Sequence, residues 1–163
     1  FQVNFETEIS WKDLRLKFRN LQPDFMSNKL TTEAIKKIWL PDVDYKYTVE
    51  NQLSNKKRDL YLEMIANGTL DHNDPFMNVN FDGSAVNVIL RTEYIGSFLC
   101  DFDVYYFPLD VQTCSITLNI NSKYVTFANY LSQVSYDGIQ LLSSFKVEDV
   151  WLNTEKSLSN FTK

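Results

Sequence analysis

The residues with the most distinctive chemistry in this sequence are its only two cysteines, Cys100 and Cys114. A disulfide between them closes a loop of about 15 residues and stabilises the fold by roughly 3 kcal/mol, because it restricts the unfolded chain. Disulfides persist in oxidising compartments, so the pair predicts an extracellular location. The alternative, two free buried thiols in a cytosolic protein, is the less favoured interpretation.

The sequence offers little for catalysis or for metal binding. It has one histidine, His72, and no glycine-rich phosphate loop among its four glycines. His72 lies beside Asp71 and Asp74, but a metal site needs three or more convergent ligands, and a lone surface histidine is the better interpretation. We therefore expect no enzyme, no metal and no organic cofactor.

The composition is that of a single folded domain. Of the 163 residues, 44% are hydrophobic and 15% aromatic, which excludes disorder and allows a sizeable core. The net charge of −5 argues against a nucleic-acid partner, which needs a basic face. No stretch approaches the roughly 18 consecutive apolar residues of a membrane-spanning helix.

Alternating apolar and polar residues predict that β-strands position the cysteine pair. The alternation is clearest over residues 1–11 and returns over 115–121 and 140–151. Asn67-Gly68, which follows an apolar stretch at 60–65, is typical of a hairpin turn. Short strands with turns at intervals of roughly 8–12 residues predict an antiparallel β-sandwich.

A single segment, residues 31–39, has a helical pattern. Thr31 provides a cap, Ile35 and Ile38 provide an apolar side, and Pro41 ends the segment. We expect a helix of one or two turns.

Three motifs occur in an order that resembles the Cys-loop receptors, the pentameric ligand-gated ion channels. They are Trp11-Lys-Asp-Leu-Arg-Leu16, Trp39-Leu-Pro-Asp42, and the cysteine loop with its tip Phe107, Pro108, Leu109 and Asp110. The resemblance runs from about residue 1 to about residue 145 and is loose after Asn121. The alternative is an unrelated adhesion-type sandwich. In that case the three ordered motifs are a coincidence, and the chain also lacks the cysteine–tryptophan–cysteine spacing of such domains.

The resemblance implies both a fold and an assembly. It implies an all-β, twisted, immunoglobulin-like antiparallel sandwich with at most a short helix, in which residues 1–163 are part of an extracellular ligand-binding domain. Four further subunits complete a pentameric ring at the plasma membrane, and a small-molecule agonist binds between subunits on the extracellular side. The last principal binding loop and the chain's own transmembrane domain are expected after Lys163.

In the family, the tip of the cysteine loop rests on the membrane domain and couples agonist binding to pore opening. A rigid apolar tip such as Phe107-Pro108-Leu109 is costly in water and useful against a membrane-embedded partner. This favours a channel subunit over a secreted soluble protein of the acetylcholine-binding-protein type, whose cysteine loop is more polar. The other alternative is that the loop is only a hairpin closed by a disulfide.

The resemblance places the complementary side of the binding site on two strands. Glu6 and Glu8 occupy ligand-facing positions on the first strand, and Ile89, Arg91 and Glu93 lie near such positions on the second. Glycine and type A GABA receptors carry an arginine at the position of Glu8. A glutamate there repels a carboxylate, so we expect an amine or metal cation rather than a simple amino-acid anion, unless Glu6 and Glu8 are only a solvated strand face.

The principal side follows the second motif. Its candidates are Asp44, Tyr45, Lys46 and Tyr47. One of the tyrosines lines an aromatic cage for a cation, or both pack in the fold; the choice depends on a one-residue register.

The second principal loop departs from the family. Asn121 stands where nicotinic receptors have a tryptophan, and Tyr124 replaces it only if the loop carries an insertion. An acetylcholine-type agonist is therefore in doubt.

Two tripeptides are acceptors for N-linked glycosylation, Asn67-Gly-Thr69 and Asn160-Phe-Thr162. They agree with secretion, although such tripeptides often occur by chance.

Overall fold

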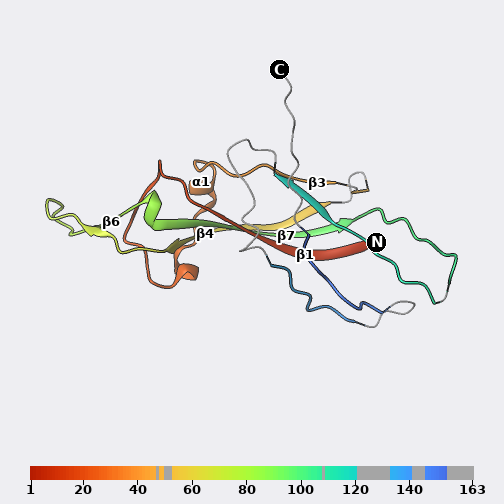
Figure 1. Cartoon of the computed structure of the whole chain (residues 1–163). Coiled ribbons are helices and arrows are strands. Elements are labelled where there is room, and N and C mark those ends of the chain that lie inside the picture. Colours follow the sequence, from red (N-terminus) through yellow and green to blue (C-terminus); the bar gives the residue numbers. More distant parts are fainter. Residues whose placement is uncertain (47, 50–52, 108, 121–132, 141–145, 154–163) are drawn as a thin grey trace, which may run out of the picture.

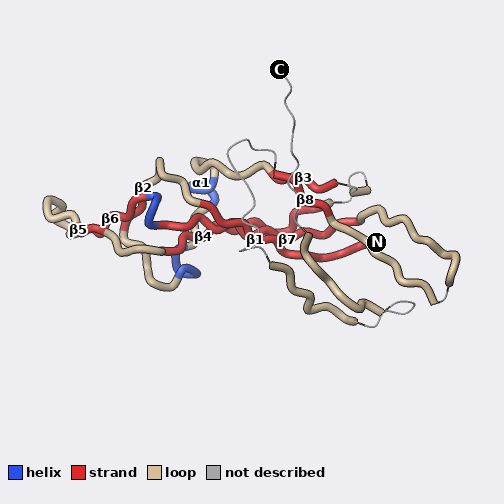
Figure 2. Tube along the Cα trace, viewed as in Figure 1, coloured by secondary structure: helices blue, strands red, loops and turns tan. Residues whose placement is uncertain are grey.

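The computed structural model describes residues 1–46, 48–49, 53–107, 109–120, 133–140 and 146–153, and strands dominate these ranges (Figure 2). The strands are β1 Gln2–Trp11, β2 Lys17–Arg19, β3 Val43–Lys46, β4 Ser54–Met64, β5 Thr69–Leu70, β6 Val79–Asp82, β7 Val86–Ser97 and β8 Thr117–Ile120. The helical segments described are η1 Phe25–Asn28, α1 Thr32–Ile35 and η2 Gly83–Ala85. The predicted all-β class is confirmed.

The strands form three antiparallel sheets, with the orders β1-β7-β4, β2-β6-β5 and β3-β8. The first sheet runs along the middle of an elongated molecule, and β3 and β8 lie against it (Figure 1). The β5–β6 hairpin marks one end of the molecule, and the cysteine loop, coloured green to teal, extends at the other (Figure 1). Sheets packed face to face in this way make the predicted sandwich.

The predicted alternation in β1 appears directly in its burial. Every even-numbered residue of β1 is exposed and every odd-numbered residue is partly buried. The odd side faces the core, which is built from Leu60, Leu62, Phe81, Val86, Val88 and Leu90. Because successive side chains of a strand point to opposite faces, the even side of β1 is free for polar groups.

The short predicted helix is confirmed as α1. The hydroxyl of Thr31 accepts a hydrogen bond from the main-chain nitrogen of Ala34, as a capping residue does. The rings of the two motif tryptophans, Trp11 and Trp39, lie 6.2 Å apart, edge to face. The first two family motifs therefore join β1 to the segment that precedes β3.

The hairpin predicted at Asn67-Gly68 is wrong. β4 pairs with β7, and β5 pairs with β6 across a longer loop at residues 71–78. Gly68 instead lies tightly against β6, where an added Cβ would come within 2.5 Å of the Cγ1 atom of Val79. The glycine serves a close approach of two segments and not a two-residue turn.

The strand predicted over residues 140–151 is not seen in the part of this stretch that the structure describes, Gln140 and residues 146–151. Gln140 does accept a main-chain hydrogen bond from Val147, at 2.7 Å. No helix long and apolar enough to cross a membrane occurs within the described ranges.

The predicted disulfide is present, with the Cα atoms of Cys100 and Cys114 5.4 Å apart. The loop between them exposes large apolar side chains, and Leu109 is 88% exposed. The other exposed apolar members are Phe102, Val104, Tyr105, Tyr106, Phe107 and Val111. Asp110 lies beside this tip, where the amide of Gln112 donates a hydrogen bond to its carboxylate. The apolar tip predicted from the sequence is thus exposed at one end of the molecule.

The aspartate and arginine of the first motif fix the turn after β1. Asp13 is buried and accepts two hydrogen bonds from the side chain of Arg15, at 2.8 and 2.7 Å. The hydrogen bond from Arg15 lowers the pKa of this aspartate. Gly83 lies against the same turn, so close that an added Cβ would be 1.9 Å from the main-chain oxygen of Asp13.

We therefore expect Gly83→Ala to destabilise the fold by about 2–3 kcal/mol or more, because the clash is with backbone that cannot rotate away. Ser84→Ala is the matched control, since Ser84 is the exposed neighbour of Gly83 in η2. Denaturant unfolding of the purified protein measures both changes. Equal stability of the two variants would contradict this packing.

Candidate functional site

The residues predicted for the complementary side lie on one face of the β1-β7-β4 sheet, which we call the outer face. The strand register places Glu6 opposite Glu93 and Glu8 opposite Arg91. On the other side of β7, Lys57 and Asp59 of β4 lie opposite the same two β7 residues. The outer face comprises Glu6, Glu8, Ser10, Lys57, Asp59, Tyr61, Ile89, Arg91 and Glu93.

An ion pair joins β1 to β7 on this face. The Nε atom of Arg91 donates a hydrogen bond to the carboxylate of Glu8 at 2.7 Å. Its guanidinium also lies 5.4 Å from the ring of Phe25 and 5.7 Å from the ring of Tyr61. The bond to Glu8 raises the pKa of Arg91, and stacking on two rings further holds the cation in place.

A second group of charges surrounds Asp59. The side chain of Lys29 contacts one carboxylate oxygen at 2.8 Å, and Lys57 contacts the other at 3.1 Å. The hydrogen bond from Lys29, helped by that from Lys57, lowers the pKa of Asp59. The Asp59 side chain is only 12% exposed, so the two lysines compensate the loss of its hydration.

Glu6 and Glu93 differ from these paired charges. They lie directly opposite each other on β1 and β7, and neither forms an ion pair within the described part of the chain. Like charges on facing strand positions destabilise a sheet unless a cation lies near them. Lys57 lies opposite Glu93 and Arg91 also attracts Glu6, so cations lie near both carboxylates. Counted together, the described outer face and Lys29 hold four carboxylates and three cations, a net charge of −1.

The remaining β7 candidate, Ile89, is buried. It lies opposite Tyr61, and Phe25 of η1 packs edge to face on that tyrosine at 6.1 Å. Asn28 at the end of η1 donates a hydrogen bond to the main-chain oxygen of Leu62. The η1 segment thus covers this end of the outer face, and the charged part beside it stays open.

The structure fixes the register of the principal-side candidates in β3. Tyr45 points into the fold, where its ring lies 5.5 Å from Phe5 and 5.0 Å from Tyr94. Burial raises the pKa of its hydroxyl. Asp44 and Lys46 lie on the opposite, exposed side of the strand. Four further candidates, Tyr47, Pro108, Asn121 and Tyr124, lie outside the described residues, as does Asn160.

Sequence reasoning did not find the contributions of Lys29, Phe25 and the β4 residues to the outer face. Lys57 and Asp59 are two positions apart, and side chains with this spacing lie on the same face of a strand. The sequence therefore indicates weakly that these two residues share a face. Only the pairing of β4 with β7 shows which face that is.

The region around His72 contains no group of metal ligands. Within the described ranges, no three histidine, cysteine or acidic side chains converge. The carboxylates of Asp71 and Asp74 instead accept hydrogen bonds from the main-chain nitrogens of Asn73 and Phe76. These aspartates shape the loop between β5 and β6.

We expect Asp59→Asn to destabilise the protein by about 1–3 kcal/mol at neutral pH, the usual cost of losing charged hydrogen bonds. The folded-state pKa of Asp59 is lowered, so its contribution is complete above the unfolded pKa of about 3.9 and is lost as the pH falls through the folded value. Thermal midpoints of wild type and variant should therefore converge below about pH 4. Asp101→Asn, on an exposed carboxylate, is the control, and a difference that persists in acid would contradict the assignment.

Comparison with known proteins finds relatives of this chain. The chain is 27% identical over 161 residues to the gamma-aminobutyric acid receptor subunit rho-3 of Homo sapiens, which covers 98% of this chain and 27% of that protein. It is 30% identical over 111 residues to the human rho-2 subunit, covering 66% of this chain and 19% of that protein. The chain thus spans about a quarter of the length of the rho-3 relative, and no solved structure matches it significantly. The neurotransmitter-gated ion-channel ligand-binding domain family matches residues 1–163, and the chain belongs to this family.

Proposed function

We propose that the chain is the agonist-binding part of a channel subunit, which forms a pentameric ring with four further subunits at the plasma membrane. The agonist lies between subunits on the extracellular side, against the outer face. The observation that carries this proposal is the convergence of Glu6, Glu8, Arg91 and Glu93 on one open sheet face. Glu8 and Arg91, for example, are 83 positions apart in the chain.

The charges of this face favour an agonist with a positive group. Arg91 is engaged by Glu8, and Lys29 and Lys57 are engaged by Asp59. In the described part of the face, the charged groups that form no ion pair are two carboxylates, those of Glu6 and Glu93. A cation 4 Å from one carboxylate gains about 1 kcal/mol in water and about 4 kcal/mol in a partly desolvated interface. An ammonium group therefore binds this face better than a carboxylate does.

The relatives are named for gamma-aminobutyric acid, a molecule with both groups. We propose that an agonist of this chain depends on its amino group at the outer face. Arg91 is paired with Glu8 through its Nε atom, so a carboxylate that approaches Arg91 is also repelled by Glu8.

Glu6→Gln should raise the agonist concentration for half-maximal current by roughly 5- to 10-fold, which corresponds to about 1–1.4 kcal/mol. The full-length subunit is expressed in oocytes and tested with amines, amino acids, protons and divalent metals. Glu33→Gln removes an exposed carboxylate on α1 and should leave the response unchanged. Currents evoked by glycine or gamma-aminobutyric acid that neither Glu6→Gln nor Glu8→Gln alters would refute the charge argument.

We further propose that the cysteine-loop tip transmits agonist binding to the chain's own transmembrane domain. Exposed apolar residues at one end of the molecule, among them Phe107 and Leu109, suit a membrane-embedded partner better than water. The alternative is a secreted soluble protein of the acetylcholine-binding-protein type, in which this exposed surface has no partner.

Leu109→Ser should reduce the maximal current at least several-fold while surface expression and agonist binding persist, since a polar tip loses its apolar contact. The matched control is Leu14→Ser, because Leu14 is 75% exposed in the turn after β1. Radioligand binding and voltage clamp on the same oocytes separate the two effects. Unchanged currents would exclude the tip from coupling, and release of the whole protein into the medium would establish the soluble alternative.

A further inference from the structure

We propose that Asn67 carries an N-linked glycan whose first sugar lies in the groove beside it. The tripeptide Asn67-Gly68-Thr69 has a central residue other than proline and a hydroxyl residue two positions after the asparagine. The Cys100–Cys114 disulfide indicates passage through an oxidising compartment. The secretory pathway, in which that disulfide forms, also attaches such glycans.

The backbone at this position turns the acceptor side chain outward. Gly68 faces β6, where an added Cβ would lie 2.5 Å from Val79 Cγ1 and 2.8 Å from the main-chain oxygen of Asn80. Its two neighbours, Asn67 and Thr69, are exposed. Because the central residue faces the protein, the residues on either side point to solvent and leave room for a bulky group on Asn67.

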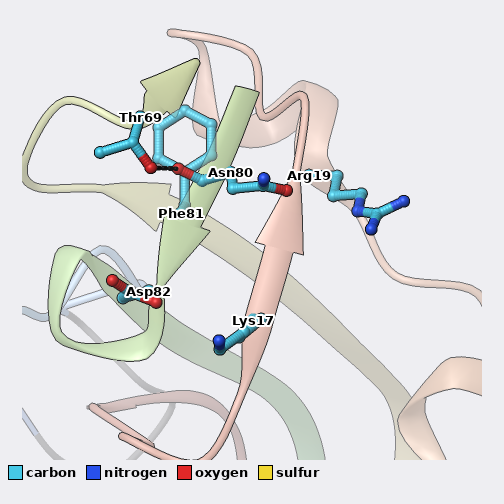
Figure 3. A pocket seen from close by; sticks show the side chains of 6 residues that line it. All are labelled: Lys17, Arg19, Thr69, Asn80, Phe81 and Asp82. Atoms are coloured by element: carbon cyan, nitrogen blue, oxygen red, sulfur yellow. Dashed lines mark hydrogen bonds between the residues drawn. The ribbon is translucent and has the colours of Figure 1, made fainter. Parts of the chain in front are cut away.

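The hydroxyl of Thr69 lies at the edge of the β2-β6-β5 sheet. It donates a long hydrogen bond of 3.4 Å to the main-chain oxygen of Asn80 (Figure 3). A bond of this length is weak. The folded chain therefore holds the acceptor tripeptide in place without burying either of its functional side chains.

A shallow groove of about 430 Å³ adjoins Asn67, which forms part of its wall. Leu21, Pro23, Met64 and Phe81 give the groove an apolar surface, and Asn20 and Gln22 add amide groups. A pyranose ring has an apolar face of C–H groups and a polar edge of hydroxyls, so it matches a surface with both characters. The first N-acetylglucosamine of a glycan on Asn67 is attached at this wall.

The modification is a group transfer from a lipid pyrophosphate-linked oligosaccharide. The side-chain nitrogen of Asn67 forms a bond to the anomeric carbon of the first sugar and loses one proton to a base of the transferase. The bond from that carbon to the phosphate oxygen breaks, and the lipid pyrophosphate leaves with the electron pair. Transfer occurs on the growing chain, so the folded structure decides only whether the product is accommodated.

The position also separates the glycan from the coupling surface. Asn67 precedes the β5–β6 hairpin at one end of the molecule, and the cysteine loop lies at the other end (Figure 1). A glycan on Asn67 therefore leaves the apolar tip of that loop uncovered.

The first experiment maps the site on the full-length subunit expressed in mammalian cells. Digestion with peptide N-glycosidase F in ¹⁸O-water converts a glycosylated asparagine to labelled aspartate, and mass spectrometry should find this label at Asn67. Because Asn67-Gly68 also deamidates without the enzyme, only the label in excess of an enzyme-free digestion is counted. Thr69→Ala should abolish this excess, and Thr69→Ser, which keeps the hydroxyl, should retain it and serves as the folding control. A peptide that contains only unmodified Asn67 in wild type and in Thr69→Ser overturns the proposal.

The second experiment tests the groove, in an Asn160→Gln background so that Asn67 bears the glycan under study. The protein is expressed in cells that keep its glycans in the high-mannose form, from which endoglycosidase H leaves the first sugar in place and peptide N-glycosidase F removes it. The thermal midpoint should not change after the former and should fall by roughly 2–4 °C after the latter. Asn67→Gln should match the fully deglycosylated protein, which shows that the new aspartate charge is not the cause. Equal midpoints after the two digestions overturn the seating of the sugar in the groove.

Discussion

The pairing of β7 with β1 on one side and with β4 on the other is the constraint on which the rest of the structure depends. One side of β7 faces the core through Val88 and Leu90, and the other carries Arg91 and Glu93 on the outer face. A slip of one residue would exchange these sets, burying charges and exposing apolar side chains. The apolar core therefore fixes the position of the candidate binding residues, although none of them belongs to it.

The charges on the outer face are arranged by this register and then by pairing. Arg91 of β7 engages Glu8 of β1, and Asp59 of β4 is held by Lys57 of the same strand and by Lys29, which follows η1. Most positive charge on the face is consequently used within the protein. On the proposed function, recognition of the agonist depends on Glu6 and Glu93, the carboxylates of the described face that form no ion pair, and not on the composition of the face alone.

Patterns within short segments predicted much of this fold. The alternation of β1 and the Thr31 cap of α1 depend on neighbours within a few residues, and the sequence shows them directly. The hairpin expected at Asn67-Gly68 was wrong because the tight contact of Gly68 is with β6, a segment more distant in the chain. The same limit applies to the site. The hydrogen bond between Glu8 and Arg91 joins residues that are 83 positions apart. This bond and the packing of η1 on Tyr61 depend on long-range pairing, which a local pattern does not contain.

Within one subunit, the disulfide links the strand that carries the candidates for the complementary side to the strand that supports the candidates for the principal side. Cys100 follows the end of β7, the strand that carries Arg91 and Glu93, and Cys114 precedes β8, which pairs with β3 and so supports Asp44 and Tyr45. Tyr45 in turn packs against Phe5 and Tyr94 of the β1-β7-β4 sheet. A displacement of either sheet is therefore passed to the same covalently closed loop, because a bond that closes a short loop leaves its two ends little freedom to separate. On the proposed function, this loop responds to agonist contacts on both faces of the subunit, and its exposed apolar tip is the part that meets the membrane domain.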